Sequence, residues 1–146
     1  MTRQELTHLL QSEIPLCAFM QLAVAESSDN AIVTNAPLSP NRNVHQTGFA
    51  GSLYALAVAT GWALVYNKMQ AEKAEGSLVV KTAKIHYKRP VKSDIRLTAE
   101  LNEQQKEQGL TERLKQNGRA ECTLKVWIES ENRRCGYLEA NYIIIA

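Results

Sequence analysis

The longest uncharged run of the chain lies at its centre, from Phe49 to Tyr66. Small residues alternate with large apolar ones along it, so a helix built from this run would be apolar on every face. The run is too long for one strand, and it predicts a buried helix that the rest of the chain covers. Its small residues would let neighbouring backbone approach closely.

A membrane span is the alternative for this run, because about 18 apolar residues is the lower limit for crossing a bilayer. Gly, Ser and Thr dilute the run, and it is the only one of its kind in the chain. The strands predicted on either side also need an apolar element to cover, and this helix is the sole candidate. We therefore expect a buried helix and no contact with a membrane.

Alternating apolar and polar positions are typical of strands in six other segments. These are residues 18–26, 31–38, 78–90, 95–101, 119–129 and 135–145. The first two segments flank a group of turn-forming residues, which predicts a hairpin. Strict alternation in the third would place Val80 and His86 on one face and Val79 and Tyr87 on the other.

Two further segments have helical features. Residues 2–12 begin with Thr2 and Glu5 at the spacing of a capping box, and their leucines share one face, which predicts a short amphipathic helix. Residues 103–117 are polar and end at Gly118, which favours a short helical insertion or an extended polar crossing.

Together these elements predict one α+β domain over residues 1–146. The strands would form an antiparallel β-sheet, and the long helix would lie across one face of it. The other face of the sheet would be wet or covered by a second subunit.

Composition narrows the classes of function. The net charge is only +2, and the basic residues are interspersed with Glu, which argues against nucleic-acid binding. Cys17, Cys122 and Cys135 form no CxxC pair and are odd in number, which is typical of reduced thiols in a cytoplasmic protein. Their spacing relative to the histidines predicts no metal site. The N-terminal residues lack the apolar core of a signal peptide.

A polar, irregular stretch, residues 39–48, leads into the central helix, and Pro40 and Gly48 mark it as a loop. The first backbone N–H groups of a helix lack internal acceptors and carry the positive end of its dipole. They can therefore receive an anion or a polarised carbonyl oxygen. Capping of the helix by Thr47 or Ser52 is the alternative.

Three stretches of the sequence are similar to a known family. They are NRNVHQTGFAGSLYALAVATGW at residues 41–62, IHYKRPVKSDI at residues 85–95 and GRAECTLKVWI at residues 118–128. With the order of the elements, they resemble hotdog-fold proteins, and more specifically the YiiD C-terminal-type putative thioesterases. The resemblance covers nearly the whole chain. The first stretch is fairly specific to this group, and the other two are shared widely among hotdog proteins.

The resemblance implies a hotdog fold, with an antiparallel β-sheet wrapped around one long central helix and a short N-terminal helix beside it. It also implies a homodimer, or a dimer of dimers, with active sites at the dimer interface. The substrate would be an acyl thioester of coenzyme A or of acyl carrier protein. Coenzyme A would enter as part of the substrate, with no separate cofactor.

Many hotdog thioesterases activate a water molecule with a carboxylate on the central helix, and the resemblance places that position at Val58. No acidic residue occurs there or anywhere between Phe49 and Tyr66. The familiar mechanism of these enzymes therefore cannot be transferred to this chain unchanged.

The loop and the first turn of the helix remain as candidates. The backbone N–H of Gly51 or Ser52 would hold the carbonyl oxygen, and Asn43 or His45 would orient or deprotonate a water molecule. Thr60 would lie near the face of Ser52 and contact the water or the acyl group. A hydrogen-bonded loop histidine is the alternative for His45, and no acid–base relay accompanies Ser52 as a nucleophile.

Four further residues are candidates for substrate binding. Phe49 and Tyr54 would contact the substrate, with a core or interface position as the alternative for an aromatic side chain. Lys88 and Arg89 would meet the phosphates of coenzyme A, with a solvated strand face as the alternative.

We therefore expect an acyl thioester hydrolase. An enoyl-thioester hydratase or dehydratase is less favoured, because it would need a histidine paired with an acid on the helix. A non-catalytic acyl-CoA-binding module is the third hypothesis, and the missing helix carboxylate favours it.

Overall fold

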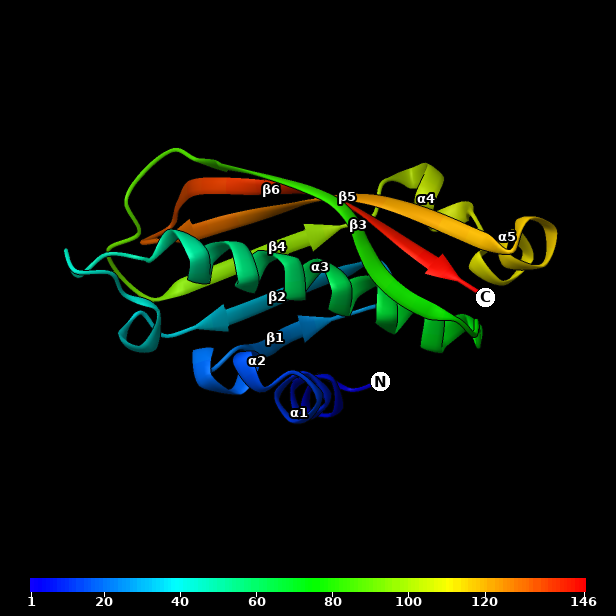
Figure 1. The fold of residues 1–146 in the computed structure, drawn as a ribbon, viewed down its shortest axis with the longest axis horizontal. Coiled ribbons are helices and arrows are strands. Elements are labelled where there is room, and N and C mark those ends of the chain that lie inside the picture. Colours follow the sequence, from blue (N-terminus) through cyan, green and yellow to red (C-terminus); the bar gives the residue numbers. More distant parts are fainter.

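A six-stranded antiparallel sheet and one long helix make up most of the protein (Figure 1). The structure, a computed structural model, describes all residues from Met1 to Ala146. The elements are α1 (Arg3–Glu13), α2 (Pro15–Met20), β1 (Ala23–Ser27), β2 (Ala31–Ala36), the 3₁₀ turn η1 (Ser39–Asn41), α3 (Ala50–Glu72), β3 (Ser77–Tyr87), β4 (Ile95–Glu100), α4 (Glu103–Glu107), α5 (Leu110–Asn117), β5 (Arg119–Ser130) and β6 (Arg133–Ile145).

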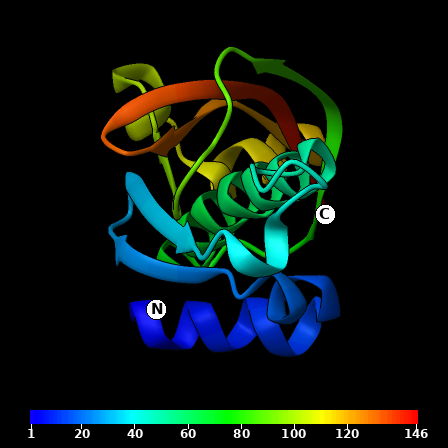
Figure 2. The ribbon, with the colours of Figure 1, turned by 90° about the vertical axis from the view of Figure 1, so that its left-hand side faces the viewer.

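The strands are ordered β1-β2-β4-β5-β6-β3, and every neighbouring pair is antiparallel. Seen from one end, the sheet curves around α3, and α1 lies outside it beside β1 (Figure 2). The α+β architecture and the long central helix are confirmed. None of the helices combines the length and the apolarity that a bilayer crossing needs.

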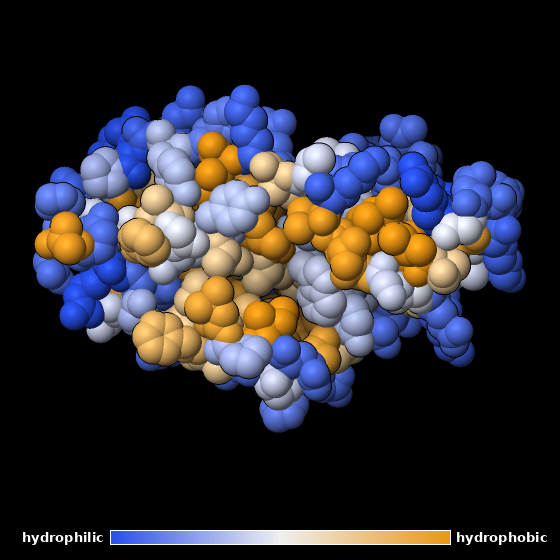
Figure 3. Space-filling model, in the orientation of Figure 1, coloured by the Kyte–Doolittle hydropathy of each residue, from blue (hydrophilic) through white to orange (hydrophobic).

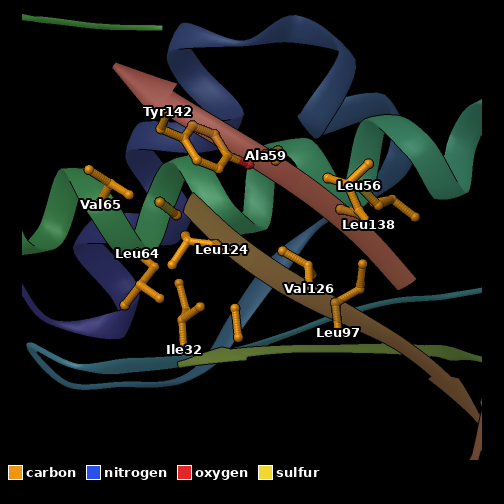
Figure 4. Packing of buried hydrophobic residues seen from close by; sticks show 14 of the residues in the cluster. Ile32, Leu56, Ala59, Leu64, Val65, Leu97, Leu124, Val126, Leu138 and Tyr142 are labelled. Atoms are coloured by element: carbon orange, nitrogen blue, oxygen red, sulfur yellow. The ribbon is translucent and has the colours of Figure 1, made fainter. Parts of the chain in front are cut away.

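The core lies between α3 and the concave face of the sheet, where large apolar side chains interdigitate (Figure 4). Members from the helix and from four strands are Leu56, Leu64, Val65, Ile32, Leu97, Leu124, Val126, Leu138 and Tyr142, each almost fully buried. Burial of such side chains stabilises the fold by about 1.5–3 kcal/mol each relative to exposure. The alternation predicted for residues 119–129 is confirmed, because every second residue from Ala120 to Ile128 is buried.

One glycine of α3 determines how closely β6 approaches. The Tyr142 side chain crosses α3 at Gly61, where an added Cβ would overlap its hydroxyl oxygen and lie 2.7 Å from Cζ. The Tyr142 hydroxyl donates to the carbonyl of Val58 at 2.7 Å. Burial raises the pKa of Tyr142, so this phenol stays protonated and keeps donating.

A buried threonine pair joins α3 to β2. The hydroxyls of Thr34 and Thr60 are 2.7 Å apart, and both residues are fully buried. Thr60 also donates to the carbonyl of Leu56 at 2.8 Å. Because a hydroxyl has one proton, Thr34 must be the donor within the pair.

This direction of donation predicts an asymmetric effect of valine substitutions. Thr60→Val leaves the buried Thr34 proton without an acceptor and should lower the free energy of unfolding by about 2 kcal/mol. Thr34→Val leaves the Thr60–Leu56 bond intact and should cost less, about 1 kcal/mol or below. Urea unfolding of both single variants and the double variant measures this. Equal losses in the two single variants would contradict the assigned direction.

The strand expected at residues 18–26 is wrong in its first half. Pro15 begins α2, a position where its fixed φ and missing N–H suit a helix. This helix ends at Gln21, which is left-handed at φ 58°, and β1 begins only at Ala23. The apolar residues Ala18 and Phe19 therefore belong to a surface turn of helix, with Phe19 71% exposed.

The predicted alternation in residues 78–90 is also wrong over part of its length. A bulge between Val80 and Thr82 inserts one residue in β3, so that Val80 pairs with Tyr142 while Thr82 pairs with Asn141. Val80 therefore lies on the core side of the sheet with Ile85, and His86 lies on the outer side. An inserted residue switches the faces of a strand, and the sequence alternation carries no sign of it.

The insertion between β4 and β5 is helical, which is the first of the two alternatives predicted for residues 103–117. It consists of α4 and α5, and Gly118 ends α5 in the left-handed conformation at φ 71°. The Glu72 carboxylate, in the last turn of α3, accepts the N–H of Leu110 at 2.7 Å and pairs with Lys68 at 3.1 Å. The insertion is thereby fixed to the end of the central helix.

Candidate active site

Asn41 fixes the point at which α3 begins. It is 1% exposed, and its Nδ2 donates to the carbonyls of Met20 at 2.9 Å and Pro37 at 2.8 Å. Its own carbonyl accepts the N–H of Phe49 at 2.7 Å, one residue before the helix. Sequence reasoning missed this residue, because a buried and an exposed asparagine look alike in a polar loop.

Asn43 closes the loop on itself. Its Oδ1 accepts the N–H of His45 at 2.9 Å and the N–H of Thr47 at 3.1 Å, and its Nδ2 donates to Thr47 Oγ1 at 2.9 Å. A bridge between Arg42 and Gly48 completes this small hairpin. The Asn43 side chain is thus used within the turn, where it orients the backbone of His45.

No side chain caps α3, so the alternative of capping by Thr47 or Ser52 is wrong. The Thr47 hydroxyl is held by Asn43 instead. The N–H of Leu53 bonds to the carbonyl of Phe49, and no acceptor of the chain pairs with the N–H groups of Gly51 and Ser52. Gly51 is exposed and Ser52 half-buried, so two N–H donors without an acceptor lie at the positive end of a helix of 23 residues.

Phe49 and two tyrosines surround this turn. A Cβ added at Gly51 would lie 2.6 Å from Phe49 Cε2, so the phenyl ring packs directly on the glycine. The Tyr87 hydroxyl, from the end of β3, donates to the carbonyl of Ala50 at 2.7 Å. Burial, and then the nearby Tyr54, raise the pKa of Tyr87, which keeps it a neutral donor. Tyr87 was not among the predicted site residues.

The sheet does not cover α3 on all sides, contrary to the expectation from its composition. Tyr54, Ala55, Val58, Trp62 and Tyr66 stay partly exposed along one stripe of the helix. Figure 3 shows apolar side chains gathered on this face, over α3 and the first half of β3. No carboxylate lies on the stripe. β3 pairs only with β6, so its other edge is free, with Val79 47% and Val80 38% exposed.

The structure brings only some of the predicted site residues together. Gly51, Ser52, Phe49 and Tyr54 share the first turns of α3. Thr60 does not join them, because it faces β2 inside the core with its hydroxyl engaged.

The remaining candidates are exposed. His45 lies in the turn of the small hairpin, and no hydrogen bond links its side chain to the first turn of α3. Lys88 and Arg89 follow β3, and both of their N–H groups bond to the carbonyl of Cys135.

The cysteines are free and buried, as expected of small apolar residues. Burial raises the pKa of all three thiols, and that of Cys122 to about 11, so none is a reactive thiolate at neutral pH. The side chains of His, Cys, Asp and Glu do not come together in a group of three or more that could hold a metal ion.

The curved antiparallel sheet around one long helix places the protein in the hotdog class. The model of the family described as "Putative thioesterase (yiiD_Cterm)" matches residues 3–146. The chain belongs to this family.

Solved structures agree with this assignment. A putative thioesterase from Shewanella oneidensis is 30% identical, with 99% of this chain and 97% of that chain covered and a TM-score of 0.88. A protein of unknown function from Chlorobaculum tepidum is 26% identical over 98% and 93% of the two chains, with a TM-score of 0.90. A probable thioesterase from Pseudomonas aeruginosa, 24% identical over 99% and 96% of the chains, has the same fold with a TM-score of 0.85.

Proposed function

We propose that this protein hydrolyses acyl thioesters of coenzyme A at the start of α3. The observation that carries the proposal is the uncapped first turn, where the N–H groups of Gly51 and Ser52 have no acceptor in the chain. Two such donors suit the oxyanion that develops when water adds to a thioester carbonyl. As the intermediate collapses, the C–S bond breaks and the sulfur leaves as the thiol with a proton from the water.

The water is oriented from the polar hairpin in this mechanism. His45 is its general base or hydrogen-bond partner, and Asn43 acts through the turn that holds His45. Val58, where related enzymes carry an acid, contributes only to the apolar stripe. The reaction therefore depends on the two N–H donors more than on a carboxylate.

The working form in this proposal is a homodimer, in which a second copy covers the free edge of β3 and the open stripe of α3. Unpaired strand edges and contiguous apolar faces are sites of association. A dimer of dimers would further cover the outer face of the sheet. The reduced, buried cysteines suit the cytoplasmic location expected from the sequence.

The test offers purified protein a panel of acyl-CoAs of different chain length and monitors the free thiol released. We expect turnover, and a fall of about tenfold or more in kcat for His45→Ala and Asn43→Ala. Val44→Ala, in the same turn and 88% exposed, is the matched control and should retain activity.

Saturable binding of acyl-CoA without thiol release would instead identify a non-catalytic binding module, which the missing acid at Val58 favours. Hydration of an enoyl-CoA with no thiol produced would identify a hydratase. Turnover that is indifferent to His45 and Asn43 would refute their roles while leaving the hydrolase assignment standing.

A further inference from the structure

A cationic cleft opens at the end of the molecule where α3 begins. It has a volume of 310 Å³ and lies between the segment that follows β3 and the β5–β6 turn. Its lining residues are Arg89, Pro90, Lys92, Ser130, Glu131, Arg133 and Cys135. Figure 2 looks at this end, where the segment between β3 and β4 passes between the start of α3 and the β5–β6 turn.

The walls of the cleft are fixed by hydrogen bonds. The Cys135 carbonyl accepts the N–H groups of Lys88 at 2.8 Å and Arg89 at 2.9 Å. The hydroxyl of buried Ser130 accepts the N–H of Ser93 at 3.2 Å and donates to the carbonyl of Asp94 at 3.1 Å. The cleft is therefore a formed concavity rather than a gap between mobile side chains.

Its charges are unbalanced. Three cationic side chains, those of Arg89, Lys92 and Arg133, face one carboxylate, that of Glu131. None of the three is in an ion pair, whereas Arg96 on the outer face of the sheet pairs with Glu129 at 3.4 Å. Unpaired cations that converge on a concave surface attract a multiply charged anion, and the planar guanidinium matches phosphate oxygens in pairs.

The cleft is also connected to the first turn of α3. Tyr87, two residues before Arg89, donates its hydroxyl to the carbonyl of Ala50. Beyond Pro90, the Val91 carbonyl accepts the N–H of Gly48 at 2.8 Å. The segment that carries Arg89 and Lys92 is thus held against the start of α3 at two points, Tyr87 and Val91.

We propose that this cleft binds the nucleotide phosphates of a coenzyme A thioester whose carbonyl lies at Gly51. This rests on the proposed hydrolase function and selects coenzyme A over acyl carrier protein. A concave cleft of this volume suits a small molecule. A carrier protein would present one phosphodiester and a broad acidic surface instead. Lys92 and Arg133 join Arg89 as substrate-binding residues.

The test compares the double variant R89Q/R133Q with the wild type, with R96Q as the matched control for an exposed arginine outside the cleft. For acyl-CoA, KM should rise by about tenfold or more while kcat stays within about twofold, because the phosphates are remote from the reacting carbonyl. For acyl-pantetheine, which lacks the phosphates, and for acyl carrier protein, the double variant should behave as the wild type. Circular dichroism and melting temperature check that the variants are folded.

A binding measurement separates this proposal from the hydrolase assignment. Adenosine 3′,5′-bisphosphate should bind the wild type in calorimetry, and about tenfold or more weakly to R89Q/R133Q. If adenosine 3′,5′-bisphosphate binds in this way but no acyl-CoA releases its thiol, the phosphate-binding role of the cleft stands and the hydrolase assignment is refuted. If the double variant hydrolyses acyl-CoA with an unchanged KM, the cleft does not bind the phosphates, but the hydrolase assignment stands. Equal losses of activity with acyl-CoA and acyl-pantetheine would lead to the same conclusion. A loss confined to acyl carrier protein would reassign the cleft to that carrier.

Discussion

Gly61→Ala is expected to lower the free energy of unfolding by about 3 kcal/mol, although alanine is the better helix former by about 1 kcal/mol. The added Cβ would overlap the Tyr142 hydroxyl, and the ring of Tyr142 is fully buried, so it can move aside only by disturbing the packed side chains around it. The ring must shift, and its bond to the Val58 carbonyl is lost with it. A melting temperature lower by roughly 8 °C is the expected readout by calorimetry.

Gly51→Ala is the matched control, ten residues earlier on the same helix. Its Cβ would meet only the exposed Phe49 ring, which can rotate away, so the stability should be unchanged or slightly higher. In the double variant Gly61→Ala/Tyr142→Phe, removal of the overlapping hydroxyl should recover part of the loss. If the Gly61→Ala variant has the same melting temperature as the wild type, Tyr142 does not pack against Gly61 as closely as described.

If the proposed dimer and hydrolase activity hold, Val80→Lys should convert the dimer into a monomer and reduce thioester hydrolysis by about 100-fold, because the site would be completed only between two copies. Val80 is 38% exposed on the free edge of β3 and on the side that faces α3. A charge there would have to be buried unpaired at the interface, whereas the isolated chain would keep it in water. Sedimentation velocity together with the thiol-release assay measures both effects.

Leu16→Lys serves as the control for this prediction. Leu16 is a 53% exposed apolar residue of α2, away from β3, and its substitution should leave both association and activity unchanged. A Val80→Lys protein that remains dimeric would place the subunit contact elsewhere. A monomer with full activity would show that one chain holds the whole site.

The large features of the fold were predictable because they depend on composition over many residues. The uncharged run from Phe49 to Tyr66 predicted the central helix, most of which is buried, and the alternation from Ala120 to Ile128 predicted a strand with one face in the core. Features that depend on a single residue were not predictable. The bulge after Val80 changes the face of a strand without changing its pattern, and α2 takes the place of the first half of an expected strand because Pro15 begins a helix.

The candidate site follows the same division. The sequence located the polar loop and the open first turn, since a helix start lacks acceptors whatever its partners are. It could not distinguish the roles of Asn41 and Asn43. Asn41 depends on the Met20 carbonyl brought from α2, whereas Asn43 depends on the N–H groups of His45 and Thr47 in the hairpin. Helical spacing also placed Thr60 near Ser52. In the structure, Thr60 lies on the side of α3 that the sheet covers, and its side chain is therefore in the core.

The hairpin before α3 is closed by backbone hydrogen bonds and by the side chains of Asn43 and Thr47. The side chains of residues 44–46 therefore have no part in keeping the turn shut. Their chemistry is free to change between one protein and the next at little cost in folding. A surface of this kind, beside a fixed pair of N–H donors, lets substrate preference diverge while the rest of the domain stays the same.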